Sequence, residues 1–326
     1  SDMRLRLVPQ DTNIDFFKYA RVTFGAAVVA MVLSIGIWLA MGLNFGIDFL
    51  GGTAIRTEAS QAVDVGAYRD ALTPLNLGDI SITEVFDPTF DDDQHVAMIR
   101  IQAQEGQESV TPETVAAVQA ALRTVYPEMT FPSVESVGPK VSGELIITAL
   151  IAVGASLVAL LIYIWLRFEW QFSIGAVAAL IHDIVLTIGI FSLLQIRFDL
   201  ATIAALLTII GYSINDTVVI FDRLRENLIK YKQRDLREVM NLSANETLSR
   251  TLMTSGTTLL ALIALLVLGG DVIRGFVFAI FWGVIVGTYS SIYVAKNVVL
   301  MIGVKRDWSK PSSGGGGGTQ FANIDA

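Results

Sequence analysis

The distribution of apolar residues predicts six helices long enough to cross a membrane. A helix rises 1.5 Å per residue, so about 20 apolar residues cover a hydrocarbon core roughly 30 Å thick. Such stretches occupy residues 24–43, 145–166, 172–194, 200–221, 251–268 and 276–295. The first stretch lacks a small-residue cleavage site, which favours a retained helix over a removed signal peptide.

The connection between the first two spans, residues 44–141, is long enough to fold as a domain. Alternating apolar and polar positions predict strands at 53–58, 79–86, 95–103 and 130–137. A helix is predicted at 62–72, and a second one from Thr111, as the N-cap, and Pro112 to Pro127. The order βαββαβ is that of a ferredoxin-like split βαβ fold. We therefore expect a membrane protein of six helices with one α+β domain between helices 1 and 2.

The basic residues predict the orientation of the helices. With the N-terminus inside, 16 of the 23 Lys and Arg fall in the inner segments, which are 1–23, the connection at Arg167, 222–250 and 296–326. Because loops rich in Lys and Arg stay in the cytoplasm, both termini are predicted to be cytoplasmic. The outer loop holds 15 acidic and five basic residues. That balance argues against nucleic acid or anionic lipid as its ligand.

Composition narrows the classes of function. With 53% hydrophobic and 17% charged residues, the 326-residue chain is too apolar for a soluble protein. It contains no cysteine, which excludes disulfides, thiolate metal sites and thiol nucleophiles. The dipeptide Gly-Lys of a Walker A loop does not occur, so no ATP site is expected. We also expect no cofactor and no metal.

Two segments outside the spans carry local signals. In the inner connection, SANE at residues 243–246 has the form of a capping box and predicts that a helix begins there and continues into the fifth span. The glycine-rich stretch at residues 312–320 has the composition of a flexible linker.

Polar residues inside the spans are candidates for function. An ionisable group at membrane depth costs roughly 2.5 to 3.5 kcal/mol, so such groups are usually paired or functional. Asn215 and Asp216 interrupt the fourth span, and His182 and Asp183 lie near the middle of the third. On the fifth span the spacing i, i+4, i+7, i+8 places one set on a single helical face. This set is Arg250, Thr254, Thr257 and Thr258.

Each set also has a purely structural interpretation. Threonines can serve as packing contacts between helices, and Arg250 can extend toward the headgroups. His182 and Asp183 can satisfy each other as a buried polar cluster, and Asp216 can face a water-filled crevice. A protease dyad of Asp183 and Asp216 is disfavoured, because the typical Gly-x-Gly-Asp context is absent.

The polar residues suggest a way to move protons. A carboxylate in a low dielectric favours its neutral form, whereas a nearby guanidinium favours the charged form. Movement of Arg250 toward and away from Asp216 would therefore load and release a proton. Thr254 can pass the proton, and His182, beside Asp183, can act as a relay. We expect Asn215 to orient the Asp216 carboxylate by hydrogen bonding.

Five motifs together resemble the SecF family of the bacterial SecDF complex, in the resistance-nodulation-division superfamily. They are NFGIDFLGG (44–52), GYSINDTVVIFDRLREN (211–227), LSRTLMTSGTTLLAL (248–262), GGDVIRGF (269–276) and GTYSSIYVA (287–295). The resemblance covers nearly all of residues 4–305. It implies a multi-pass protein of the bacterial inner membrane with a periplasmic domain at 44–141.

The resemblance also implies partners and an activity. Members pair with SecD and associate with the SecYEG channel. They use the proton-motive force to promote translocation of the unfolded preprotein after the ATP-driven SecA step, and YajC is a further candidate partner. The family's intramembrane aspartate falls on Asp216, and its arginine and threonine fall on Arg250 and Thr254.

Two glycine patterns accompany these residues. The family's Gly-Ile-Asp-Phe-x-Gly-Gly motif falls at the outer end of the first span, on Gly46, Asp48, Gly51 and Gly52. Gly283, Gly287 and Ser291 recur every four residues, which predicts a face for close helix packing.

Two other functions fit a non-enzymatic chain of this layout. One is a proton-coupled exporter of small molecules or lipids from the same superfamily, although such exporters more often carry two large outer loops. The other is a passive scaffold that stabilises the translocation channel. A dependence of export on the proton gradient would separate the scaffold from the proton-driven subunit.

Overall fold

The structure, a computed structural model, describes residues 12–16, 18–104 and 110–303, with the backbone alone at residues 271 and 272. Within these ranges six helices are long and apolar enough to cross a membrane. They are α1 (Ala20–Met41), α5 (Pro139–Arg167), α6 (Trp170–Leu194), α7 (Leu200–Lys230), α8 (Leu236–Leu268) and a last helix of three parts. The last helix comprises α9 (Asp271–Tyr289), a π-helical turn (Ser290–Val294) and α10 (Ala295–Ile302). This confirms the six-helix membrane class.

The helices extend beyond the apolar stretches that mark them in the sequence. The fourth span continues as helix to Lys230, and the fifth begins at Leu236. The capping-box prediction at residues 243–246 is therefore wrong, because these residues lie inside α8. The extensions pack together, since Leu224 and Leu228 of α7 share a buried cluster with Val239 and Met240 of α8. Hydropathy detects only the part of a helix that lipid surrounds, so it misses extensions stabilised by such packing.

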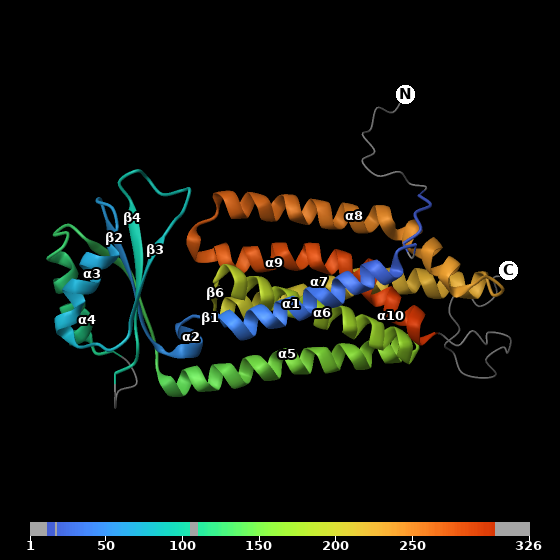
Figure 1. Ribbon diagram of the computed structural model, residues 1–326, viewed down its shortest axis with the longest axis horizontal. Coiled ribbons are helices and arrows are strands. Elements are labelled where there is room, and N and C mark those ends of the chain that lie inside the picture. Colours follow the sequence, from blue (N-terminus) through green and yellow to red (C-terminus); the bar gives the residue numbers. More distant parts are fainter. Residues whose placement is uncertain (1–11, 17, 105–109, 304–326) are drawn as a thin grey trace, which may run out of the picture.

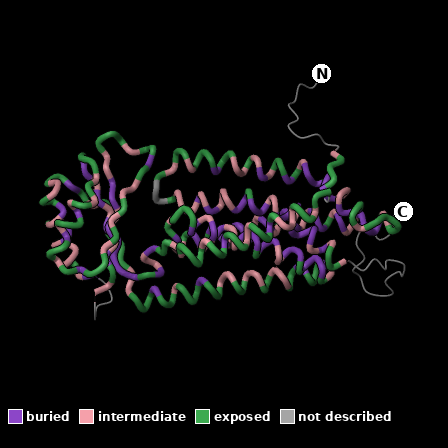
Figure 2. The backbone as a smooth tube through the Cα atoms, in the orientation of Figure 1, coloured by how far each residue is buried: buried purple, intermediate pink, exposed green. Residues whose placement is uncertain are grey.

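The helices form an inner and an outer group. Buried residues make up 44% of the span windows of α6 and α7 and 50% of that of the last helix, against 6% for α5 and 11% for α1. Figure 2 shows the same contrast, with buried positions concentrated in the middle of the bundle. The inner helices are therefore the ones that bury polar side chains within the chain itself.

The α+β domain lies at one end of the bundle, which we call the domain end (Figure 1). Its strands are β2 (Gly52–Ala59), β3 (Ile80–Val85), β4 (His95–Ile101) and β5 (Thr130–Val137), and its helices are α3 (Val65–Leu72), the 3-10 turn η1 (Thr73–Leu75) and α4 (Pro112–Arg123). The strand order β3-β4-β2-β5, antiparallel throughout, confirms the ferredoxin-like topology. α3 and α4 cover the sheet face that points away from the bundle.

Local signals in the sequence account for these elements. Thr111 caps α4 by accepting a hydrogen bond from the backbone N–H of Thr114, and Pro112 occupies the first helical position. Alternate residues of β2 and β4, including Ile55 and Ile99, point into one buried core with Leu122 of α4. The alternation in the sequence thus places one sheet face against the two helices.

Several contacts join the domain to the bundle. The chain passes from β5 through Gly138 directly into α5. The Arg274 guanidinium, near the start of α9, donates to the carbonyl oxygen of Phe86 (2.6 Å) and forms an ion pair with Asp87 (3.2 Å). The domain is therefore anchored to α9 as well as to the adjoining helices.

Candidate functional site

Asp216 lies on α7 in the middle of the inner group of helices. The residue is 5% exposed, and its Oδ2 atom has no hydrogen-bond partner among the described residues. Leaving a buried polar atom unbonded costs free energy, so a native structure keeps one only where something else requires it. The unpartnered oxygen marks Asp216 as a group that is not serving as a packing contact in this conformation.

Arg250 lies on α8, near enough for its charge to act on the Asp216 carboxylate. No ion pair within 4.0 Å joins the two residues in the part of the chain that the structure describes, and Arg250 is exposed. The carboxylate and the guanidinium are thus neighbours without contact. They are free to approach, which a switching counter-charge would require.

The threonines that follow Arg250 bond to their own helix. The Thr254 hydroxyl donates to the carbonyl oxygen of Arg250 (2.9 Å), and that of Thr258 to the carbonyl oxygen of Thr254 (2.8 Å). The Thr257 hydroxyl donates to the carbonyl oxygen of Met253 (2.9 Å). These hydroxyls form a stripe on one face of α8, as the spacing predicts, and within the described part of the chain they donate only to carbonyl oxygens of their own helix.

Asp183 and His182 form a buried cluster on α6. Each residue is 1% exposed, and their side chains lie 3.2 Å apart, from His182 Nδ1 to Asp183 Oδ1. The other carboxylate oxygen, Oδ2, accepts a hydrogen bond from Ser213 of α7 (2.8 Å). The His182 ring stacks on Tyr289 with centroids 6.3 Å apart. Oδ1 of Asp183 is therefore occupied by a neighbour on its own helix, and Oδ2 joins α6 to α7.

The glycine pattern on α9 matches a pattern on α7. A Cβ at Gly283 would lie 2.3 Å from Ile209, and one at Gly287 would lie 3.4 Å from Ser213. One turn further on, the Ser291 and Thr217 hydroxyls lie 3.2 Å apart. Three positions spaced by four residues on each helix thus meet, which confirms the predicted close-packing face. This contact holds Ser213 where Asp183 can reach it.

A second polar contact joins α7, α8 and α9. The Tyr212 hydroxyl donates to Ser255 Oγ (3.3 Å), which lies 2.7 Å from the hydroxyl of Thr288. Sequence reasoning missed these residues, because isolated hydroxyls in apolar spans carry no signal that tells which helix they face. These hydroxyls link α8, which carries Arg250, to α7 and α9.

Asn215 lies on the exposed face of α7, away from the buried Asp216 side chain. It is exposed on α7, and no hydrogen bond joins its side chain to Asp216, although both residues are described. The prediction that Asn215 orients the carboxylate is therefore wrong for this conformation. Adjacent residues of a helix differ by about 100° in direction, so Asn215 and Asp216 face different neighbours.

The glycine motif after α1 shapes the start of α7. Asp48, in the short helix α2 (Ile47–Leu50), accepts a hydrogen bond from the backbone N–H of Leu200 (3.1 Å). Asp199 caps the same helix end through Thr202 (3.1 Å). Two carboxylates at a helix N-terminus stabilise it through the helix dipole. Asp48 is thus a cap for the helix that carries Asp216.

The glycines of the motif are required by the backbone. Gly51 and Gly52 have φ of 74° and 102°, and a Cβ at Gly52 would lie 2.2 Å from the carbonyl oxygen of Ile101. A Cβ at Gly46 would lie 3.2 Å from Asp199. Beside them β1 (Asn44–Phe45) pairs in parallel with β6 (Arg197–Phe198), which ties the ends of α1 and α6 together. The motif therefore has a structural role at the domain end.

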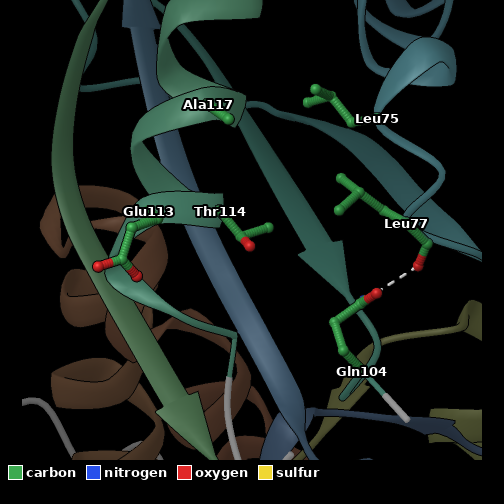
Figure 3. A pocket seen from close by; sticks show the side chains of 6 residues that line it. All are labelled: Leu75, Leu77, Gln104, Glu113, Thr114 and Ala117. Atoms are coloured by element: carbon green, nitrogen blue, oxygen red, sulfur yellow. Dashed lines mark hydrogen bonds between the residues drawn. The ribbon is translucent and has the colours of Figure 1, made fainter.

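The α+β domain contains a small pocket between η1 and α4. Figure 3 shows Leu75, Leu77, Thr114 and Ala117 around it, with Glu113 at its edge. Gln104 also lines it, and its amide donates to the carbonyl oxygen of Leu77 (3.1 Å). The mixed lining offers no set of convergent charges. Among the described residues no group of three or more His, Cys, Asp or Glu could hold a metal ion.

The geometry thus combines inner helices that bury acids with a small α+β domain at one end. Protein family models match two regions of this layout. The C-terminal model of protein export membrane proteins SecD/SecF matches residues 117–305, and the SecD/SecF GG motif matches residues 36–63. These matches define the class as SecD/SecF membrane proteins.

Curated relatives narrow the class to one subunit. The protein translocase subunit SecF of Cereibacter sphaeroides is 67% identical over 323 residues, which are 99% of each chain. That of Rhodobacter capsulatus is 63% identical over 94% of each chain, and that of Rickettsia rickettsii is 40% identical over 94% of this chain and 97% of the relative. The chain belongs to the SecF family of protein translocase subunits.

Solved structures agree with this assignment. The crystal structure of SecDF, a translocon-associated membrane protein from Thermus thermophilus, matches with a TM-score of 0.81 and 37% identity over 92% of this chain. A crystal structure of SecDF in the super-membrane-facing form matches with a TM-score of 0.66 and 38% identity. This chain spans 40% of each of those solved chains. SecD is therefore the partner that the relationship supports.

Proposed function

We propose that this subunit, together with SecD, uses the proton-motive force to promote preprotein translocation through SecYEG after the SecA-driven step. The observation that carries the proposal is the buried Asp216 carboxylate, which has an oxygen without a partner inside the bundle. A carboxylate at membrane depth can take up and release a proton at little structural cost only if no packing contact depends on its charge. Asp216 meets this condition, and Asp183 does not.

Arg250 is the switching counter-charge in this proposal. Its charge acts on Asp216 without contact in the present conformation. Movement of α8 toward α7 would pair the two groups and release the proton, whereas movement apart would favour reprotonation. Thr254 follows Arg250 by one turn and would hold water in the path. Asp183 joins α6 to α7 through Ser213 in this proposal, and His182 beside it stays a candidate relay for the proton.

The outward face of α7 is proposed as the contact with SecD. Its exposed residues are small or polar, and a Cβ at Gly211 would meet nothing within 4 Å. These residues are Ala201, Ala204, Thr208, Gly211 and Asn215. Small residues permit close helix packing in membranes, and an amide such as Asn215 gains a partner there. An asparagine facing lipid would have no such compensation.

The proposed location is the bacterial inner membrane. The domain end would face the periplasm and the opposite end of the bundle would face the cytoplasm, in line with the prediction that both termini are cytoplasmic. The excess of Lys and Arg in the segments at that opposite end supports this orientation. The proton would then enter from the domain end, down its gradient, and each charge carried would supply about 2.3 kcal/mol per 100 mV.

The test is preprotein export into inverted vesicles with and without a proton gradient. Asp216→Asn keeps the size of the side chain and removes its titration, so we expect export to lose its response to the gradient while the ATP-driven part persists. Asp222→Asn is the matched control, because Asp222 lies on the same helix but is exposed and paired with Arg167 at 2.8 Å. The control should keep the full response.

A passive scaffold is the competing function. The observation in its favour is the hydrogen-bonded Asp183 cluster, which fixes α6 against α7. It predicts that export does not depend on the gradient in the parent protein. A full response in Asp216→Asn would instead show that another group carries the proton.

A further inference from the structure

The segment before α1 lies across the end of the bundle opposite the α+β domain. This N-terminal strap, residues 12–16, is held by Asn241 and Asn245 of α8. The Asn245 amide accepts from the backbone N–H of Ile14 (2.8 Å) and donates to its carbonyl oxygen (2.8 Å). Asn241 accepts from the backbone N–H of Phe16 (3.1 Å). Two asparagines one turn apart thus bind the strap through its backbone.

The strap ends in a buried aromatic ring. Phe16 is 6% exposed and packs in one cluster with Ile220 of α7 and with Ala244 and Leu248 of α8. Ile292 of the π-helical turn completes the cluster. The ring therefore fills a seat formed by α7, α8 and the last helix. In contrast, Ile14 is 48% exposed, so its side chain contributes little to the contact.

The cluster that holds Phe16 lies next to Asp216. Ile220 follows Asp216 by four residues on α7, so the two share one face of that helix. Ile292 directly follows Ser291, whose hydroxyl lies 3.2 Å from that of Thr217. Phe16 therefore covers the Asp216 region from the end of the bundle that lies opposite the α+β domain.

A buried lysine next to the Phe16 ring raises the free energy of the conformation in which the ring is bound. Lys296 of α10 is 0% exposed, and its Nζ lies 4.8 Å from the centroid of the Phe16 ring. Nζ has no hydrogen-bond partner among the described residues, and neither amide atom of the neighbouring Asn297 has one. Contact with an aromatic face replaces only part of the hydration that an ammonium loses. Water that entered the seat would bond to these groups, which offsets the loss of Phe16 packing.

We propose that Phe16 is a removable plug that controls water access to Asp216 from the end opposite the α+β domain. With the strap bound, the ring separates the Asp216 region from solvent at that end. With the strap released, water enters along Ile220 and Ile292 and hydrates Lys296. The role of Asp216 as proton carrier rests on the proposed function, whereas the access of water does not.

The test measures access with a single reporter cysteine. Because the chain has no cysteine, Thr217→Cys provides one thiol, of similar size, beside Asp216. The protein is assembled with a cysteine-free SecD in inverted vesicles, and a membrane-impermeant methanethiosulfonate is added outside. Phe16→Ala should increase the labelling rate roughly tenfold or more, as when a protected position opens by local unfolding. Ile14→Ala, in the same strap, should leave the rate unchanged.

Asn245→Ala gives a second route that makes no cavity in the seat. It removes the two backbone hydrogen bonds at Ile14 and should also increase labelling, while melting curves report whether each variant is folded. Unchanged labelling in folded Asn245→Ala and Phe16→Ala proteins would overturn the plug. Equal increases in Ile14→Ala would also overturn it, because they would mean general loosening of the strap.

The result is independent of proton coupling. Labelling needs no gradient, so Phe16→Ala should increase it equally when Asp216→Asn is also present. If Asp216→Asn leaves the gradient response intact but Phe16→Ala still increases labelling, the proposed function fails and the plug stands. If labelling changes in neither Phe16→Ala nor Asn245→Ala, the plug fails whatever the export assay shows.

Discussion

Asp183 and Asp216 are two acids buried in the same helix bundle, with opposite surroundings. Asp183 is 1% exposed, and its two oxygens contact His182 and Ser213. Asp216 is 5% exposed, and one of its oxygens has no partner in the described part of the chain. Both side chains are buried, but only the Asp183 carboxylate is stabilised by hydrogen bonds to neighbouring side chains.

The difference shows that two buried acids can differ in whether a hydrogen bond depends on their charge. A buried acid with bonded oxygens holds helices together, and removal of its charge leaves other groups unsatisfied. A buried acid with a free oxygen can lose its charge without breaking a contact. The contrast therefore predicts that the two residues separate stability from function.

The largest expected effect is on stability at Asp183. Asp183→Ala leaves His182 Nδ1 and Ser213 Oγ buried without a partner, which should lower the free energy of unfolding by about 3 kcal/mol. Asp216→Asn should change it by less than about 0.5 kcal/mol, since no hydrogen bond to the free oxygen is lost. Denaturant titration of both variants in the same detergent measures the two values. Equal losses would mean that Asp216 is also a structural contact.

The next effect tests the contact that gives Asp183 its partner. Gly283→Ala places a Cβ 2.3 Å from the nearest atom of Ile209, which is 1% exposed and cannot move aside freely. Overpacking of this kind should cost about 2 kcal/mol and separate α7 from α9. Gly154→Ala on α5 is the control, because a Cβ there meets nothing within 4 Å. It should be neutral or slightly stabilising, since alanine is the better helix former.

Thermal unfolding in detergent compares the two glycine variants. A loss in Gly154→Ala as large as that in Gly283→Ala would show that the α7–α9 contact is not specially close. A loss of stability confined to Gly283→Ala would indicate that the α7–α9 contact, which positions Ser213 for Asp183, tolerates no added side-chain volume.

Much of the fold follows from local patterns, and the exceptions have physical causes. Alternation in residues 53–58 and the N-cap at Thr111 predict elements of the α+β domain because each signal depends on near neighbours. The predicted helix start at residues 243–246 is wrong because Ser243 bonds inside the bundle instead. Its hydroxyl donates to the carbonyl oxygen of Val239 (2.8 Å) and accepts from Asn227 of α7 (3.0 Å). A capping motif and a tertiary contact use the same residue types.

The candidate site was predictable in its members but not in its pairings. The cost of burial singles out Asp216 and Asp183 from sequence alone. The assignment of Ser213 to Asp183 depends on how α7 is rotated against α6, and the residues are 30 positions apart. The same rotation turns Asn215 outward. Phe16 and Lys296 were missed because no local pattern reveals that the segment before α1 folds back onto α8.

The smallest expected effect concerns an unpartnered polar atom outside the membrane. Tyr68 in the α+β domain is 0% exposed, and its hydroxyl has no hydrogen-bond partner among the described residues, like Oδ2 of Asp216. Burial raises the pKa of Tyr68 to about 12, and nearby charges, first that of Tyr126, add to the effect. A buried hydroxyl without a partner lowers stability, because it has lost its hydration and gained no hydrogen bond. Tyr68→Phe removes it and should therefore stabilise the protein by about 1 kcal/mol.

The pH dependence makes this last prediction sharper. In the unfolded chain a tyrosine ionises near pH 10, whereas folded Tyr68 stays neutral until about pH 12. A raised folded-state pKa gives stability that is present below the unfolded value and is lost as pH rises through the folded one. The parent should therefore lose stability between about pH 10 and 12 relative to Tyr68→Phe, as measured by denaturant titration. A difference that is constant across this range would mean that the Tyr68 hydroxyl reaches solvent. Tyr68 would then no longer serve as the functionless counterpart of Asp216.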